Sequence, residues 1–133
     1  MKLVLAASVL MLAAVAGEAA AQEPQIVVER SRDRLEIERV LQADNLDLGS
    51  MSPRQVAEAM ARIPKGQAPD EFWARYQGHV RAWQWYAALA STPGVNGHDV
   101  VEAEAMVNAT FGDVERIAAR YAARLPKARP TRE

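Results

Sequence analysis

The sequence predicts an all-α protein, a small four-helix bundle in which a long antiparallel hairpin of the third and fourth helices is covered by two shorter helices. Four segments carry apolar residues at steps of three and four, which is the period of an amphipathic helix. Segments with glycine, proline and helix-capping residues separate them. The alternation typical of strands is absent from these segments, so a sheet is not expected.

The start of the chain has the three-part pattern of a secretory signal peptide, which we assign to residues 1–21. Lys2 supplies a positive charge, residues 3–16 form an apolar run, and the small residues 19–21 precede the expected cleavage site. The run is shorter than the roughly 20 apolar residues that a membrane-spanning helix needs. We therefore expect cleavage after Ala21, export to a bacterial periplasm, and no membrane contact afterwards.

The composition disfavours several classes of function. The chain has no cysteine, which excludes thiol catalysis, zinc–thiolate sites, iron–sulfur clusters and covalent c-type haem. Its formal net charge of −1 does not suggest binding to nucleic acid. The two histidines form no HExxH or similar pair, and a serine nucleophile elbow and a glycine-rich phosphate loop are also missing from the sequence. We expect a binding protein rather than an enzyme, with no resident cofactor or metal.

Residues 22–32 are polar except for a β-branched run at residues 26–28. That run has no partner strand, so we expect an extended or disordered arm. The helical domain is expected to cover residues 33–125. Its first helix should begin at Asp33, which has capping-box spacing to Glu36, and end near Asn45. The residues that line one side of this helix are Ile37, Val40, Leu41 and Asp44.

The second helix has the clearest start signal. Ser52 is placed as the N-cap, Pro53 as the first helical residue, and Gln55 at the third position. The segment 64–66, Pro-Lys-Gly, should end the helix. Its apolar face consists of Val56, Ala59, Met60 and Ile63.

The third helix should start after Pro69 and run to Ser91. Asp70 and Glu71 lie in its first turn, where negative charge suits the helix dipole. The predicted core stripe contains Phe72, Tyr76, Val80, Trp83, Ala87 and Ala90, with Trp73 at its edge.

The fourth helix is expected to start at Asp99 and to continue through Gly112 until Pro126, with a kink near residues 110–112 as the alternative. Residues 126–133, rich in Arg, Lys and Pro, should form a disordered tail. The apolar positions are Val100, Ala103, Val107, Phe111, Val114, Ala118, Tyr121 and Leu125.

Trp85 and Leu89 lie opposite the core stripe of the third helix. Ala74, Gly78 and Ala82 extend this second stripe with small residues. Either the first two helices cover the stripe, or it is exposed and contacts a partner. The main functional hypothesis is therefore recognition of a protein partner, or self-association, through a candidate interaction face of Trp85, Leu89, Gly78 and Ala82.

The two histidines are the candidate polar sites. His79 borders the core stripe, where a histidine usually serves as a hydrogen-bonded packing residue. His98 is expected in the loop before the fourth helix, near Asp99 and Glu102, but Asp99 is better explained as a helix cap than as a metal ligand. The alternative function is binding of a hydrophobic small molecule or of non-covalent haem between the third and fourth helices, with His79 or a methionine as ligand.

Overall fold

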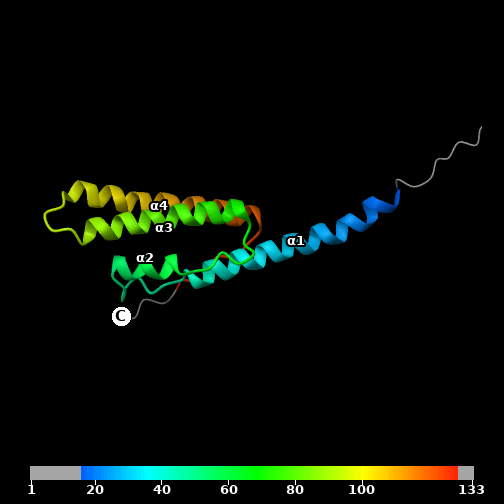
Figure 1. Ribbon diagram of the computed structural model, residues 1–133, viewed down its shortest axis with the longest axis horizontal. Helices are drawn as coiled ribbons and strands as arrows, with labels where there is room; N and C mark the ends of the chain where they lie inside the picture. Colours follow the sequence, from blue (N-terminus) through cyan, green and yellow to red (C-terminus); the bar gives the residue numbers. More distant parts are fainter. Residues whose placement is uncertain (1–15, 129–133) are drawn as a thin grey trace, which may run out of the picture.

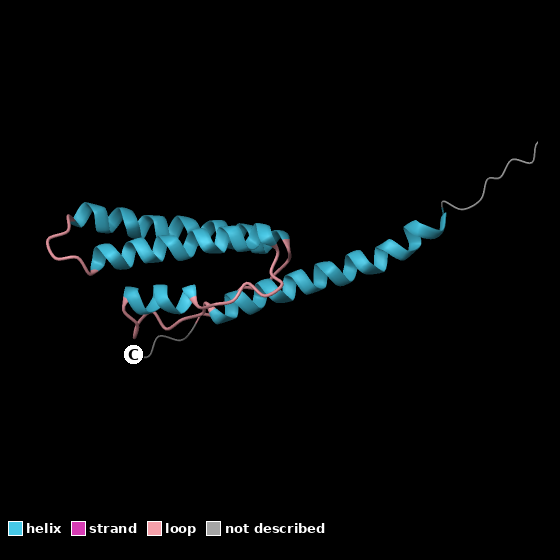
Figure 2. Ribbon diagram, viewed as in Figure 1, coloured by secondary structure: helices cyan, strands magenta, loops and turns pink. Residues whose placement is uncertain are grey.

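The computed structural model describes residues 16–128, with side chains from residue 24 onward. Four helices follow one another along the chain: α1 (Ala16–Ala43), α2 (Pro53–Ala61), α3 (Asp70–Ala90) and α4 (Gly97–Arg120). The described residues contain no strand, as Figure 2 shows, and the predicted all-α class is confirmed. In Figure 1, α3 and α4 form an antiparallel hairpin, and α2 and the C-terminal half of α1 lie against one side of it.

The expectations for the N-terminal part were wrong. Residues 22–32 belong to α1 and do not form an extended arm, and α1 is the longest helix instead of a short cover. Its N-terminal half projects away from the other helices, and residues 24–32 are exposed (Figure 1). A helix satisfies its backbone groups within the segment, so the β-branched run at residues 26–28 needs no partner strand.

The signal peptide and its cleavage remain a prediction. Residues 1–15 lie outside the described part of the chain, and residues 16–21 are the first residues of α1. Pro24 lies inside α1. If cleavage occurs after Ala21, Pro24 falls in the first turn of the mature helix, where a missing N–H removes no helical hydrogen bond.

The core lies where all four helices meet, and it contains most of the residues that the helical period of each segment predicted. Phe72 and Tyr76 of α3 are fully buried at its centre. Two differences concern the edges of the α3 stripe: Trp83 is only half-buried against the core, and Ala90 is exposed at the end of the helix. The predicted apolar positions Phe111 and Leu125 are also exposed, whereas Ile117 of α4 is buried and was not predicted. The buried residues that pack around Phe72 and Tyr76 are Ile37, Val40, Leu41, Val56, Met60, Ile63, Ala68, Val80, Val114, Ile117 and Ala118.

The start of α2 was predicted correctly, because its signal is local. Ser52 Oγ accepts a hydrogen bond from the backbone N–H of Gln55 at 3.2 Å, and Gln55 Oε1 accepts one from the N–H of Ser52 at 2.9 Å. This reciprocal pair is a capping box, and Pro53 follows the cap as expected. α3 also begins directly after Pro69, as predicted.

α4 begins earlier than expected. Asn96, rather than Asp99, is the N-cap, since its side-chain oxygen accepts from the N–H of His98 at 3.0 Å. Asp99 therefore lies in the first turn and His98 inside the helix. The helix continues through Gly112, which agrees with the prediction of one long helix.

α4 ends at Arg120 rather than near Leu125. Ala122 has a left-handed backbone with φ 54°, and its N–H donates to the carbonyl of Ala119 at 3.0 Å. The N–H of Ala123 donates to the carbonyl of Ala118 at 3.1 Å. These two bonds form a Schellman motif with alanine at the position that usually holds glycine, which is why the stop was not visible in the sequence.

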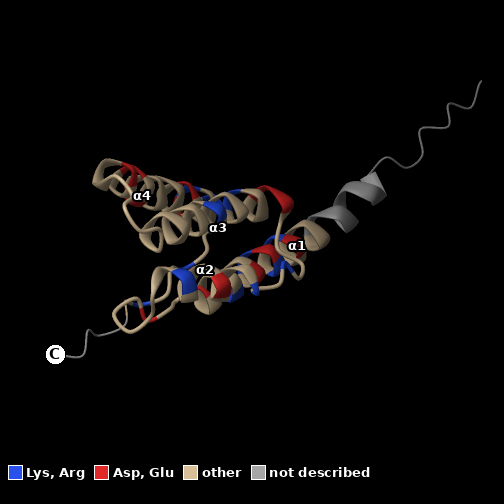
Figure 3. Cartoon of the chain, turned by 60° about the vertical axis from the view of Figure 1, so that its left-hand side comes forward, with Lys and Arg blue, Asp and Glu red and all other residues tan. Residues whose placement is uncertain are grey.

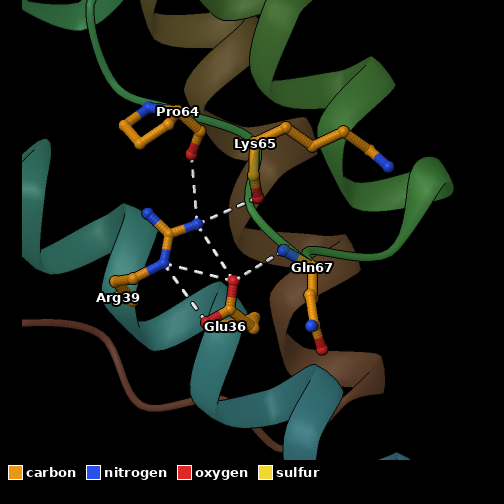
Figure 4. Close-up of polar contacts among 5 residues, drawn as sticks. All are labelled: Glu36, Arg39, Pro64, Lys65 and Gln67. Carbon is orange, nitrogen blue, oxygen red and sulfur yellow. Dashed lines mark hydrogen bonds and ion pairs between the residues drawn. The ribbon is translucent and has the colours of Figure 1, made fainter.

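Glu36 and Arg39 of α1 hold the loop between α2 and α3. Arg39 Nη2 donates to the carbonyl oxygens of Pro64 at 3.1 Å and Lys65 at 2.9 Å (Figure 4). The N–H of Gln67 donates to Glu36 Oε2 at 2.8 Å. The guanidinium of Arg39 and the N–H of Gln67 lower the pKa of Glu36. This loop clamp fixes α1 against the turn that leads into α3.

The loop clamp also explains the glycine at position 66. Gly66 has φ 55°, a conformation that L-residues rarely adopt. A Cβ atom at this position would lie 2.6 Å from both Arg39 Nη2 and Glu36 Oε2. The backbone at position 66 therefore favours glycine, and a Cβ atom there would force the Arg39 and Glu36 side chains to shift.

Candidate ligand-binding cleft

A cleft of about 420 Å³ lies where all four helices meet the loop after α1 and the segment after α4. Small-molecule sites are typically mostly apolar clefts of about 300–1,000 Å³ with a few placed polar groups. The polar residues that line this cleft are Asp44, Asn45, His79, Asn108 and Glu115. Its apolar residues are Leu41, Leu46, Leu48, Val56, Met60, Trp83, Val107, Phe111, Leu125, Pro126 and Ala128.

His79 is the buried histidine of α3, with 4% of its surface exposed. Its Nδ1 lies 2.9 Å from Thr110 Oγ1 on α4, and Thr110 Oγ1 lies 2.8 Å from the carbonyl oxygen of Met106. Because the hydroxyl donates to that carbonyl, it accepts from Nδ1–H, and Nε2 keeps the lone pair of the neutral ring. Burial lowers the pKa of His79 to about 4, so the imidazole is neutral at pH 7.

Asp44, half-buried directly after α1, is the second titratable group in the cleft wall. The phenol of Tyr76, which is fully buried, donates to Asp44 Oδ1 at 3.2 Å. Burial raises the pKa of Asp44 to about 7, and this effect exceeds the lowering by the hydrogen bond from Tyr76. Near neutral pH the carboxyl is protonated in a large fraction of molecules and can donate a hydrogen bond.

The segment after α4 closes one side of the cleft. The backbone N–H of Arg124 donates to Glu38 Oε1 at 2.9 Å, and Asn45 Nδ2 donates to the carbonyl of Lys127 at 3.3 Å. Leu125 and Pro126 thereby become part of the cleft wall. Of the tail predicted to be disordered, residues 126–128 lie against the bundle, and residues 129–133 lie outside the described part.

The candidate interaction face is partly covered, and α4 lies on the adjoining side of α3. Ala82 is 5% exposed, Gly78 and Leu89 are half-buried, and Trp85 is 38% exposed. On the helical wheel Ala82 lies near His79, which contacts α4, whereas α2 packs on the side of Ala87. Trp85 therefore lies outside the core, beside the α3–α4 contact.

His98 does not form a common site with His79. It is exposed in the first turn of α4 and does not line the cleft. Where side chains are described, in residues 24–128, no group of three or more His, Cys, Asp or Glu side chains could hold a metal ion. No described helix is long and apolar enough to cross a membrane.

The sequence indicated His79 as a candidate site residue but did not indicate Asp44. The available signal was a carboxylate on the apolar side of the first helix, next to Val40 and Leu41. Comparisons of the chain with protein-family models, curated proteins and solved structures give no significant match. What the cleft can bind is therefore inferred from its geometry alone.

Proposed function

We propose that this chain is a non-enzymatic binding protein, exported to the periplasm, that holds a small and mostly apolar ligand in the cleft. The observation that carries the proposal is the combination of a 420 Å³ volume, a mostly apolar wall and two titratable groups whose pKa values the cleft shifts strongly, Asp44 and His79. The cleft is not confined to the space between α3 and α4, because α1, α2 and the segment after α4 also line it.

The polar groups in the cleft wall limit the kinds of ligand that can bind. Asp44 offers a hydrogen-bond donor when protonated, and His79 is a neutral ring with a lone pair on Nε2. Enclosing a full charge among apolar side chains is costly unless it is paired. We expect a neutral ligand with an apolar body and one hydroxyl or carbonyl group near these residues.

Non-covalent haem fits the cleft less well than an apolar organic molecule. His79 and Met60 both line the cleft, but the His79 ring is almost fully buried and its centroid lies 5.5 Å from that of Phe111. Coordination of haem iron needs more open space at a ring nitrogen than a single hydrogen bond does, and an exposure of 4% leaves little. The absorbance spectrum of the native protein tests the point: a Soret band that disappears in His79→Asn would favour haem.

The proposal can be tested with a fluorescent apolar probe, N-phenyl-1-naphthylamine, and the purified exported protein. Asn108 is exposed and lines the cleft, so Asn108→Trp should fill the cleft without disturbing the core. Glu104→Trp on the exposed part of α4 is the matched control, because Glu104 does not line the cleft. We expect at least a roughly tenfold loss of probe affinity in Asn108→Trp alone. Equal affinity in both variants would refute the cleft as the binding site.

The candidate interaction face supports a second function, self-association or capture of a protein partner. Trp85 exposes 38% of its surface, and large aromatic residues often anchor interfaces. Sedimentation velocity of the native protein and of Trp85→Ala tests self-association. A concentration-dependent dimer that is weakened in the variant would support this function. A native protein that remains monomeric at every concentration would refute self-association.

A further inference from the structure

We propose a second site, for a phosphate group, between α1 and the C-terminal turn of α4. A hollow of about 550 Å³ lies there and shares no lining residue with the cleft. Three guanidinium groups line it, two from α1 and one from α4, together with two hydroxyl groups. The polar residues of this phosphate site are Arg30, Ser31, Arg34, Arg120 and Tyr121.

The three arginines are poorly compensated by acidic side chains. Arg30 and Arg34 are four residues apart on α1, so they share a face and repel each other. Within residues 24–128 neither of them forms an ion pair. Arg120 pairs with Glu71 at 2.8 Å, but both side chains are largely exposed, and such pairs are weak. An anion between the three guanidinium groups would remove the repulsion.

Arg34, which lines the hollow, also carries a buried donor without a partner in the described part of the chain. Arg34 Nε is buried and has no hydrogen-bond partner among the described residues. A buried donor left unsatisfied is costly and calls for an acceptor. The planar guanidinium group binds oxyanions through two parallel hydrogen bonds, and a phosphate group offers enough oxygens for several arginines at once.

The two hydroxyl groups complete the set of donors. Burial and the nearby Glu71 raise the pKa of Tyr121, so its phenol keeps its proton. Asp33, which also acts on Tyr121, is paired with Arg32 at 3.3 Å. Arg120 lies in the last turn of α4, where its charge offsets the negative end of the helix dipole next to the proposed anion.

The phosphate can come from two sources, a soluble compound or a lipid headgroup. Val27 and Val28 are 63% and 67% exposed on α1 beside the arginines, and such a surface is compatible with an acyl chain. Basic and acidic residues are interspersed along the part of α1 with described side chains, as Figure 3 shows. The proposal therefore depends on the local convergence of donors and does not require a strongly basic surface.

The experiment has two arms with the exported protein at low ionic strength. Isothermal titration with sodium pyrophosphate tests soluble phosphate, and co-sedimentation with phosphatidylglycerol vesicles, compared with phosphatidylcholine vesicles, tests a headgroup. Arg34→Gln and the more exposed Arg30→Gln are the test variants. Arg62→Gln is the charge-matched control, because Arg62 is exposed and does not line the phosphate site.

We expect saturable binding in one arm, a loss of at least roughly tenfold in both test variants, and less than about twofold change in Arg62→Gln. The arm that shows binding identifies the source of the phosphate. Unfolding midpoints of the variants, measured in parallel, must stay close to that of the native protein. An absence of saturable binding in both arms, or equal losses in the test and control variants, would overturn the proposal.

Discussion

Replacing Asp44 with asparagine should make the free energy of unfolding rise more steeply with pH than in the native protein between about pH 4 and pH 6.5. Asp44 and His79 both line the cleft, and burial shifts their pKa values in opposite directions. Asparagine keeps the oxygen that accepts the hydrogen bond from Tyr76 but cannot ionise. The substitution therefore leaves the effect of His79 uncompensated.

The magnitudes follow from the size of the two shifts, at roughly 1.36 kcal/mol for each pKa unit. The pKa of Asp44 is raised from 3.8 to about 7, so the folded state retains a proton that the unfolded state has lost. This contribution to stability is complete below about pH 4 and lost as the pH rises through 7, and it amounts to roughly 4 kcal/mol.

His79 contributes with the opposite sign. Its pKa is lowered from 6.5 to about 4, so the unfolded state binds the proton more readily. The contribution is complete above pH 6.5 and lost as the pH falls through 4, and it amounts to roughly 3 kcal/mol. The contributions of Asp44 and His79 nearly cancel between about pH 4 and pH 6.5 in the native protein.

Urea unfolding followed by tryptophan fluorescence, at pH values from about 4 to 8, measures these contributions. The difference between Asp44→Asn and the native protein should grow by roughly 4 kcal/mol over this range in favour of the variant. The difference for His79→Asn should favour that variant increasingly as the pH falls below 6.5. The contributions of other carboxyl groups, such as Glu36, to the free energy of unfolding are the same in variant and native protein, so they cancel in these differences. A difference for Asp44→Asn that does not change with pH would show that water reaches this carboxyl freely.

Gly66→Ala should cost roughly 2 kcal/mol more of the free energy of unfolding than Gly94→Ala, since both glycines have positive φ but only Gly66 lies under the loop clamp. Equal losses in denaturant titrations would contradict this role of the loop clamp. Ala122→Gly should raise the free energy of unfolding by about 1 kcal/mol, because Ala122 has a left-handed backbone. Calorimetry that finds no gain would argue against the Schellman motif. Trp83→Ala should cost about 2–3 kcal/mol and Trp85→Ala less than about 1, because Trp83 packs on the core and Trp85 does not. The order of the two urea midpoints checks this.

The parts of the fold that the sequence predicted are those with local signals. The capping box at Ser52 fixes the start of α2, and the apolar steps in α3 place Phe72 and Tyr76 in the core. The start of α1 was missed because a β-branched run can be accommodated in an exposed helix as well as in a strand. The end of α4 was missed because Ala122 adopts a conformation that alanine rarely takes.

The cleft could be predicted only in part. Helical spacing placed His79 beside the core, and the structure places it in the cleft wall. The contribution of Leu125 and Pro126 depends on hydrogen bonds to Glu38 and Asn45, which are distant in sequence. Contacts of this kind have no periodic pattern, so the sequence predicted helices much better than it predicted the cavity between them.

Asp44 and His79 favour the cleft over the candidate interaction face as the main functional site. Each is a titratable group whose charged form the fold disfavours, so each lowers stability over part of the pH range. Groups with strongly shifted pKa values tend to occur at functional sites, where sequences depart from what stability alone would select. The partial exposure of Trp85 costs little stability, and single exposed apolar residues are common on protein surfaces. Two such groups in the wall of one mostly apolar cleft are therefore the stronger evidence for a ligand.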